Sequence, residues 1–177
     1  MFGVMVTVIL LCSLWMARGK LYGLGLEFIR WNPTPTKPNL LGVGVAAAAG
    51  LTVSWLFRDY HVGPQPALSE VWMGVTLDPL LEEILFRGYL FGMLEKLLGR
   101  WAPFGAGWIT ALLIAATFAL GHLVKSGITA AQIATIFGMG GIYGWLRLTS
   151  ASTVPPAAAH IAYNVVIFSA AAFLGDY

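Results

Sequence analysis

Long apolar stretches separated by short polar connections divide this chain into six candidate helices. The stretches cover residues 2–16, 40–57, 71–98, 104–123, 128–148 and 155–174. Most of them approach or exceed the roughly 20 residues that an α-helix needs to cross a bilayer. Their apolar residues are continuous and do not alternate as they would in a transmembrane β-strand. The pattern therefore predicts an all-α, polytopic transmembrane helical bundle with about six membrane helices.

Composition agrees with a membrane protein. Of the 177 residues, 58% are hydrophobic and 10% are charged, whereas soluble domains average about 25% charged residues. The first stretch lacks a basic segment before it and a small-residue cleavage site, so we interpret it as a helix and not as a signal peptide. We expect one integral-membrane domain over residues 1–177, in contact with the lipid bilayer. The net charge of +2 gives no reason to expect nucleic acid, and the single cysteine, Cys12, excludes an intrachain disulfide.

Basic residues are distributed unevenly between the two ends of the predicted bundle. The connections after the second and fourth stretches contain Arg58 and Lys125. Those after the first, third and fifth contain Arg18, Lys20, Arg30, Lys37, Lys96, Arg100 and Arg147. Because lysine and arginine accumulate in cytoplasmic loops, the second set should face the cytoplasm and both termini should lie outside. In a bacterium, this corresponds to the inner (cytoplasmic) membrane.

The third apolar stretch carries four ionisable side chains: Asp78, Glu82, Glu83 and Arg87. A charge at the bilayer centre costs at least about 2.5 kcal/mol, so ionisable residues there suggest function. Residues three or four apart share a helix face, which lets Glu83 pair with Arg87 and places Glu82 on a different face. We interpret Glu83 and Arg87 as a buried ion pair, and Glu82 as the carboxylate directed at a reacting centre. Polar packing between helices is the alternative.

Three more polar side chains lie on two later stretches. His122 follows Phe118 by four residues, and His160 and Asn164 are also four apart. Each alone is explained by an ordinary interhelical hydrogen bond. Together with the glutamates they suit hydrolysis, because a carboxylate beside a histidine can take a proton from water while another histidine and an amide stabilise an oxyanion. Zinc is the competing use of glutamate and histidine, although no H-E-x-x-H sequence is present, and we assign no metal or other cofactor.

The fifth stretch contains closely spaced glycines: Gly138, Gly140, Gly141 and Gly144. Small residues at this spacing allow a neighbouring helix to approach closely. A substrate groove is the alternative use of such a seam, and the sequence does not separate the two.

Three short motifs appear in order along the chain: E-E-x-x-x-R at Glu82–Arg87, F-x-x-x-H at Phe118–His122 and H-x-x-x-N at His160–Asn164. In this order they resemble the CPBP family of intramembrane proteases. That family includes type II CAAX prenyl endopeptidases and bacterial proteins linked to bacteriocin self-immunity. The resemblance covers a motif core of about residues 71–168.

The resemblance implies an intramembrane endopeptidase that hydrolyses a peptide bond of a membrane-associated protein or peptide. Processing of a C-terminal tail is the specific expectation. The alternatives are a zinc-dependent variant, a non-catalytic peptide-binding or immunity protein, and a proton-coupled transporter, against which the absence of two paired halves weighs. The implied roles are general base for Glu82 with assistance from His122, oxyanion stabilisation for His160 and Asn164, and support of the site for Glu83, Arg87 and Phe118.

Overall fold

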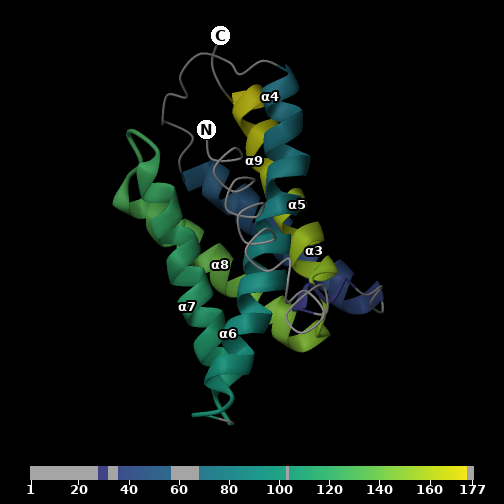
Figure 1. Ribbon diagram of the computed structural model, residues 1–177. Coiled ribbons are helices and arrows are strands. Elements are labelled where there is room, and N and C mark those ends of the chain that lie inside the picture. Colours follow the sequence, from purple (N-terminus) through teal and green to yellow (C-terminus); the bar gives the residue numbers. More distant parts are fainter. Residues whose placement is uncertain (1–27, 32–35, 57–67, 103, 175–177) are drawn as a thin grey trace.

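The computed structural model describes residues 28–31, 36–56, 68–102 and 104–174, in which five helical stretches follow one another (Figure 1). The all-helical class is confirmed for this part of the chain. The first apolar stretch, 2–16, lies outside the described residues, so the count of six membrane helices stays a prediction. The stretches are α3 (Thr36–Leu56), a continuous helix over 68–98, α7 (Ala106–Gly121) with the 3-10 turn η4 (His122–Val124), α8 (Ala130–Ser150) and α9 (Val154–Leu174).

The continuous helix over 68–98 contains two π-helical segments. It consists of α4 (Leu68–Trp72), the π-helical segment η2 (Met73–Leu77), α5 (Asp78–Glu83), the π-helical segment η3 (Ile84–Leu90) and α6 (Phe91–Leu98). Longer π-helical turns are rare and often occur at functional sites. Here they lie on either side of the short segment that ends in Glu82 and Glu83.

The outer faces of the bundle are apolar. The helical segments Ala106–Val124 and Val154–Phe173 are long and apolar enough to cross a membrane, and Leu40–Leu56 is a shorter apolar helix. Large side chains such as Trp55, Leu112 and Leu120 are exposed on these helices. Soluble monomers rarely expose contiguous apolar surface of this kind, and these faces therefore indicate an integral membrane protein.

Two hydrophobic clusters join the helices. The first lies between the continuous helix and α7, and the second joins α3, α8 and α9. The members of the first are Leu85, Phe86, Phe91, Ala111, Ile114 and Phe118. Those of the second are Ala46, Met139, Tyr143, Leu146 and Ala159. Both clusters border the polar residues of the three motifs. They hold the helices that carry these motifs together.

The glycines of α8 do two different things. A side chain on Gly140 or Gly144 would meet Ala115 or Ala111 of α7 at 3.0–3.2 Å, so these two positions allow α7 and α8 to pack closely. A side chain on Gly138 or Gly141 would meet nothing within 4 Å among the described residues. The predicted small-residue seam is therefore confirmed for Gly140 and Gly144, whereas for Gly138 and Gly141 no described residue provides the packing partner.

Candidate active site

The two adjacent glutamates have different surroundings. Glu83 is fully buried, and its Oε1 accepts a hydrogen bond of 2.9 Å from Nη1 of Arg87, one helical turn later. Arg87 also donates from Nη2 to the carbonyl of Gly140 at 3.1 Å, and its guanidinium lies 4.5 Å from the ring centre of Phe118. The predicted ion pair between Glu83 and Arg87 is confirmed. It joins the continuous helix to both α7 and α8.

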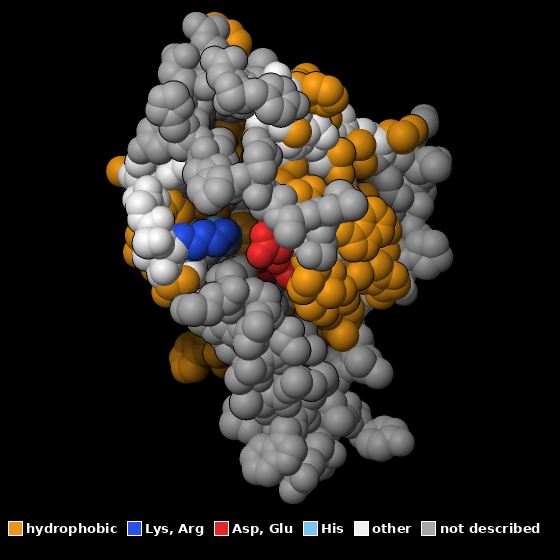
Figure 2. All heavy atoms as spheres, turned by 90° about the horizontal axis from the view of Figure 1, so that it is seen from above, with side chains coloured by type: hydrophobic (Ala, Val, Ile, Leu, Met, Phe, Trp, Pro, Cys, Tyr) orange, Lys and Arg blue, Asp and Glu red, His pale blue; other side chains and the backbone are white. Residues whose placement is uncertain are grey.

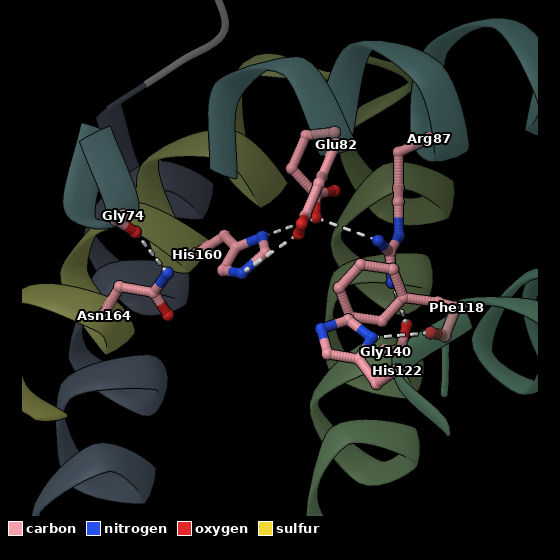
Figure 3. Close-up of polar contacts among 9 residues, drawn as sticks. Gly74, Glu82, Arg87, Phe118, His122, Gly140, His160 and Asn164 are labelled. Atoms are coloured by element: carbon pink, nitrogen blue, oxygen red, sulfur yellow. Dashed lines mark hydrogen bonds and ion pairs between the residues drawn. The ribbon is translucent and has the colours of Figure 1, made fainter. Parts of the chain in front are cut away.

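His160 of α9 lies against both glutamates (Figure 3). Its Nδ1 is 3.0 Å from Oε1 of Glu83, and its Nε2 is 3.8 Å from Oε2 of Glu82. His160 is 6% exposed, and its imidazole stacks on the ring of Tyr143, with the ring centres 4.8 Å apart and the planes inclined by 25°. The first and third motifs therefore meet through this histidine.

Asn164 is positioned by a defect in the opposite helix. In the π-helical segment η2, the N–H of Asp78 donates to the carbonyl of Met73, five residues earlier. The next residue, Pro79, has no N–H and cannot bond the following carbonyl, that of Gly74. Nδ2 of Asn164 donates to this carbonyl at 2.8 Å instead (Figure 3). The missing N–H of Pro79 thus leaves the carbonyl of Gly74 available as the acceptor that orients the amide of Asn164 on α9.

His122 lies at the end of α7, in the 3-10 turn. Its Nδ1 is 2.9 Å from the carbonyl of Phe118. A carbonyl can only accept a hydrogen bond, so Nδ1 carries a proton and Nε2 is the nitrogen that can take part in acid–base chemistry. The rings of His122 and Phe118 are in edge contact at 4.9 Å, and Phe118 also contacts His160 edge-on at 5.8 Å. The second motif therefore places an aromatic side chain between the two histidines.

All of the motif histidines border one cavity. The cavity has a volume of about 380 Å³ and is lined by Glu82, His122, His160 and Asn164. Glu83 and Arg87 do not line it. Of the two carboxylates in the first motif, only Glu82 is in contact with space that a substrate or a water molecule could occupy.

Two residues of α8 that lie outside the three motifs also belong to this arrangement. Tyr143 lines the cavity and stacks on His160, as described above. Arg147, counted above among the cytoplasmic basic residues, lies inside α8 and is 1% exposed. Its Nε donates to the carbonyl of Arg87 at 2.8 Å. An unusual arginine in an apolar stretch was the available signal for Arg147, whereas tyrosine at position 143 is unremarkable in such a helix.

The described residues contain no group of three or more histidine, cysteine, aspartate or glutamate side chains arranged to hold a metal ion. Two potential ligand atoms of this site are already hydrogen-bonded. Oε1 of Glu83 accepts from Arg87, and Nδ1 of His122 donates to a backbone carbonyl. A protonated nitrogen cannot ligate a metal.

Comparison with known protein families gives one match. A family model described as type II CAAX prenyl endopeptidase Rce1-like matches residues 64–166, which is more than half of the chain and includes all three motifs. No curated protein and no solved structure matches the chain significantly. Membership in such a family implies a membrane protease. On the strength of this match, the chain belongs to the Rce1-like family of type II CAAX prenyl endopeptidases.

Proposed function

We propose that this protein is an intramembrane endopeptidase that uses a water molecule activated by Glu82. The observation that carries the proposal is the unequal environment of the two glutamates. Glu83 is bound to Arg87 and His160 and has no contact with the cavity, whereas Glu82 lines it. A carboxylate at the wall of a cavity that two histidines also line is placed as a general base should be.

The reaction would proceed in two steps. Glu82 takes a proton from water, with His122 assisting, and the oxygen attacks the carbonyl carbon of the scissile peptide bond. Asn164 keeps one amide N–H beyond its bond to Gly74 and would donate it to the oxyanion of the tetrahedral intermediate. Because Nδ1–H of His160 faces the carboxylate of Glu83, His160 would donate to the same oxyanion from Nε2 as the imidazolium. Collapse of this intermediate breaks the C–N bond, and the proton held by Glu82 passes to the leaving amine. Hydrogen bonds of this kind are worth more in a site that excludes water.

Supporting residues would hold Glu83 in a structural role and leave Glu82 as the base. Arg87 neutralises Glu83 and holds it against α7 and α8. His160 is fixed by Glu83 on one nitrogen and by the face of Tyr143. The substrate would be a membrane-associated protein or peptide, and trimming or sorting at a C-terminal tail is our specific proposal.

The test is a comparison of protein termini in membranes and culture medium by mass spectrometry. One strain carries the native chain, one carries Glu82→Gln, and one carries Glu95→Gln. Glu82→Gln keeps the shape of the side chain and removes the base, and we expect cleavage to fall by at least about 100-fold. Glu95 lies on the same continuous helix and does not line the cavity of the site, so its substitution should leave the termini unchanged.

Termini that disappear only in the Glu82→Gln strain would name the substrates. If no terminus changes in that strain and the phenotype of the gene survives the substitution, the hydrolytic function is wrong. A non-catalytic protein that binds a hydrophobic peptide would then be the better explanation.

A further inference from the structure

The cavity of the site leads to one end of the bundle. Its lining extends from Glu82 and His160 in the interior to Glu70 and Lys125. Glu70 lies in the first turn of α4, 12 residues before Glu82, which is about 18 Å along a helix. Lys125 follows the 3-10 turn after α7. Because both side chains are exposed, the mouth of the cavity lies where α4 begins and α7 ends.

The mouth carries charges of both signs. Figure 2 looks onto this end of the molecule and shows basic and acidic side chains on opposite sides of a hollow. Among the described lining residues, the charged groups near the mouth are Glu70, Asp78 and Lys125. A polar mouth of this kind would be solvated at the membrane surface, and it continues inward to the polar residues of the site.

The opposite end of the bundle is much more basic. Arg30, Lys96 and Arg100 are exposed there, at the start of the described chain and at the end of α6. Among the described residues, Lys125 is the basic side chain in the lining of the mouth, and in the sequence the connection that precedes α4 contains Arg58 followed directly by Asp59. Since lysine and arginine in short loops mark the cytoplasmic side, the basic end faces the cytoplasm and the mouth of the cavity faces the other way.

We infer that the active-site cavity opens to the non-cytoplasmic side of the membrane. In a protein with the function proposed above, the substrate is then a polypeptide segment presented from outside the cytoplasm. An exported or membrane-anchored chain with its scissile bond near the outer surface fits, and a cytoplasmic chain does not. The direction of opening does not itself depend on catalysis.

The inference can be tested by thiol labelling of the full-length protein. Cys12→Ser removes the single native cysteine, and one new cysteine is introduced in each variant. Ile136→Cys places the probe on the cavity wall. Ser126→Cys marks the exposed connection between α7 and α8, and Arg100→Cys marks the opposite end. Right-side-out and inside-out membrane vesicles are treated with a small, charged methanethiosulfonate that does not cross membranes.

Phe137→Cys is the matched control, because Phe137 is adjacent on α8, exposed on the outside of the bundle and absent from the cavity lining. We expect Ile136→Cys to be labelled in right-side-out vesicles together with Ser126→Cys, at least tenfold faster than in inside-out vesicles. Arg100→Cys should show the reverse, and Phe137→Cys should stay unlabelled in both because lipid covers it.

Labelling of Ile136→Cys only in inside-out vesicles would overturn the inference, and so would exchanged behaviour of the two end markers. Two further results would show that no open cavity leads to position 136. One is equal labelling of Ile136→Cys and Phe137→Cys. The other is protection of Ile136→Cys in both kinds of vesicle, with labelling only after denaturation. None of these results depends on proteolysis. The comparison of termini with Glu82→Gln can therefore fail while the direction of opening stands, and the reverse also holds.

Discussion

At the scale of single residues, the site depends on giving two identical side chains different surroundings. Glu83 has both a guanidinium and an imidazole within 3.0 Å, and it is fully buried. Glu82 has the imidazole of His160 at 3.8 Å and borders the cavity. A buried carboxylate without a partner would be costly, so the pairing of Glu83 is what allows the chain to place a second carboxylate beside it for another use.

Removal of Arg87 should therefore destabilise the protein strongly. Arg87→Met retains much of the stem but leaves the fully buried Glu83 without its cationic partner and the Gly140 carbonyl without a donor. We expect the free energy of unfolding to fall by about 3–5 kcal/mol, as for other broken buried pairs. Unfolding by sodium dodecyl sulfate in mixed micelles measures this change. Arg100→Met, at an exposed arginine, should stay within about 0.5 kcal/mol of the native protein, and equal losses in both variants would contradict this account of Arg87.

Tyr143 should act on catalysis through the orientation of His160. Tyr143→Phe keeps the stacked ring and removes a hydroxyl that has no hydrogen-bond partner among the described residues, so activity should stay near that of the native protein. Tyr143→Leu removes the stack, and kcat should fall on the order of tenfold or more with little change in KM. The assay uses a peptide whose cleavage depends on Glu82. Phe91→Leu, which removes a fully buried ring that is not part of the cavity lining, is the control; the same loss of kcat in this variant would assign the effect to general packing.

The residue scale also shows what the sequence could and could not predict. Spacing alone was sufficient for the pair of Glu83 and Arg87, because both residues lie on one helix and α-helical geometry fixes their neighbourhood. The contact of His160 with both glutamates was not predictable in this way, since it depends on how α9 packs against a distant segment. The stack of Tyr143 on His160 is missing from the sequence interpretation for the same reason.

At the scale of elements, the winding of the continuous helix decides where the amide of Asn164 points. The π-helical turn before Pro79 leaves the carbonyl of Gly74 without a backbone donor, and Asn164 supplies one across the interface. The sequence located the helix over this region with nearly the observed bounds, 71–98 against 68–98. It did not predict the π-helical segments, because apolar periodicity over a few residues does not distinguish a turn of 3.6 residues from a wider one.

Pro79→Val tests this connection. Valine fills much of the buried volume of proline and restores an N–H, which can donate to Gly74 and compete with Asn164. We expect peptide cleavage to fall by about tenfold, less than the roughly 100-fold expected when an oxyanion donor is lost outright. Stability should change by less than about 1.5 kcal/mol. Asn164→Ala should reduce cleavage further, and the double variant should lose no more than Asn164→Ala alone, as expected for two residues that act on one interaction; additive losses would disconnect Pro79 from the amide.

At the scale of the whole molecule, the distribution of charge and apolar surface determines which parts of the bundle face lipid and which face water. The continuous runs of apolar residues were enough to predict an all-helical membrane protein, and the all-helical class and the apolar outer faces follow that prediction. The predicted number of six membrane helices stays a prediction, because the first predicted helix lies outside the described residues. The glycines of α8 show what sequence alone leaves open. Their spacing identified a packing surface, and only the packed structure distinguished Gly140, which faces α7, from Gly141.

The exposed face of α7 provides a prediction about the molecule as a whole. Leu112 lies near the middle of the apolar segment Ala106–Val124 and is 59% exposed. If lipid surrounds this face, Leu112→Arg places a charge in the hydrocarbon at a cost of about 2.5–3.5 kcal/mol for insertion, and Leu112→Phe should be neutral. We expect Leu112→Arg to reduce the fraction of protein that resists alkaline carbonate extraction of membranes, and to lower its abundance because uninserted chains are degraded. Insertion of the arginine variant to the native level would mean that this face meets protein or water, and the arrangement of the helices in the bilayer would have to be revised.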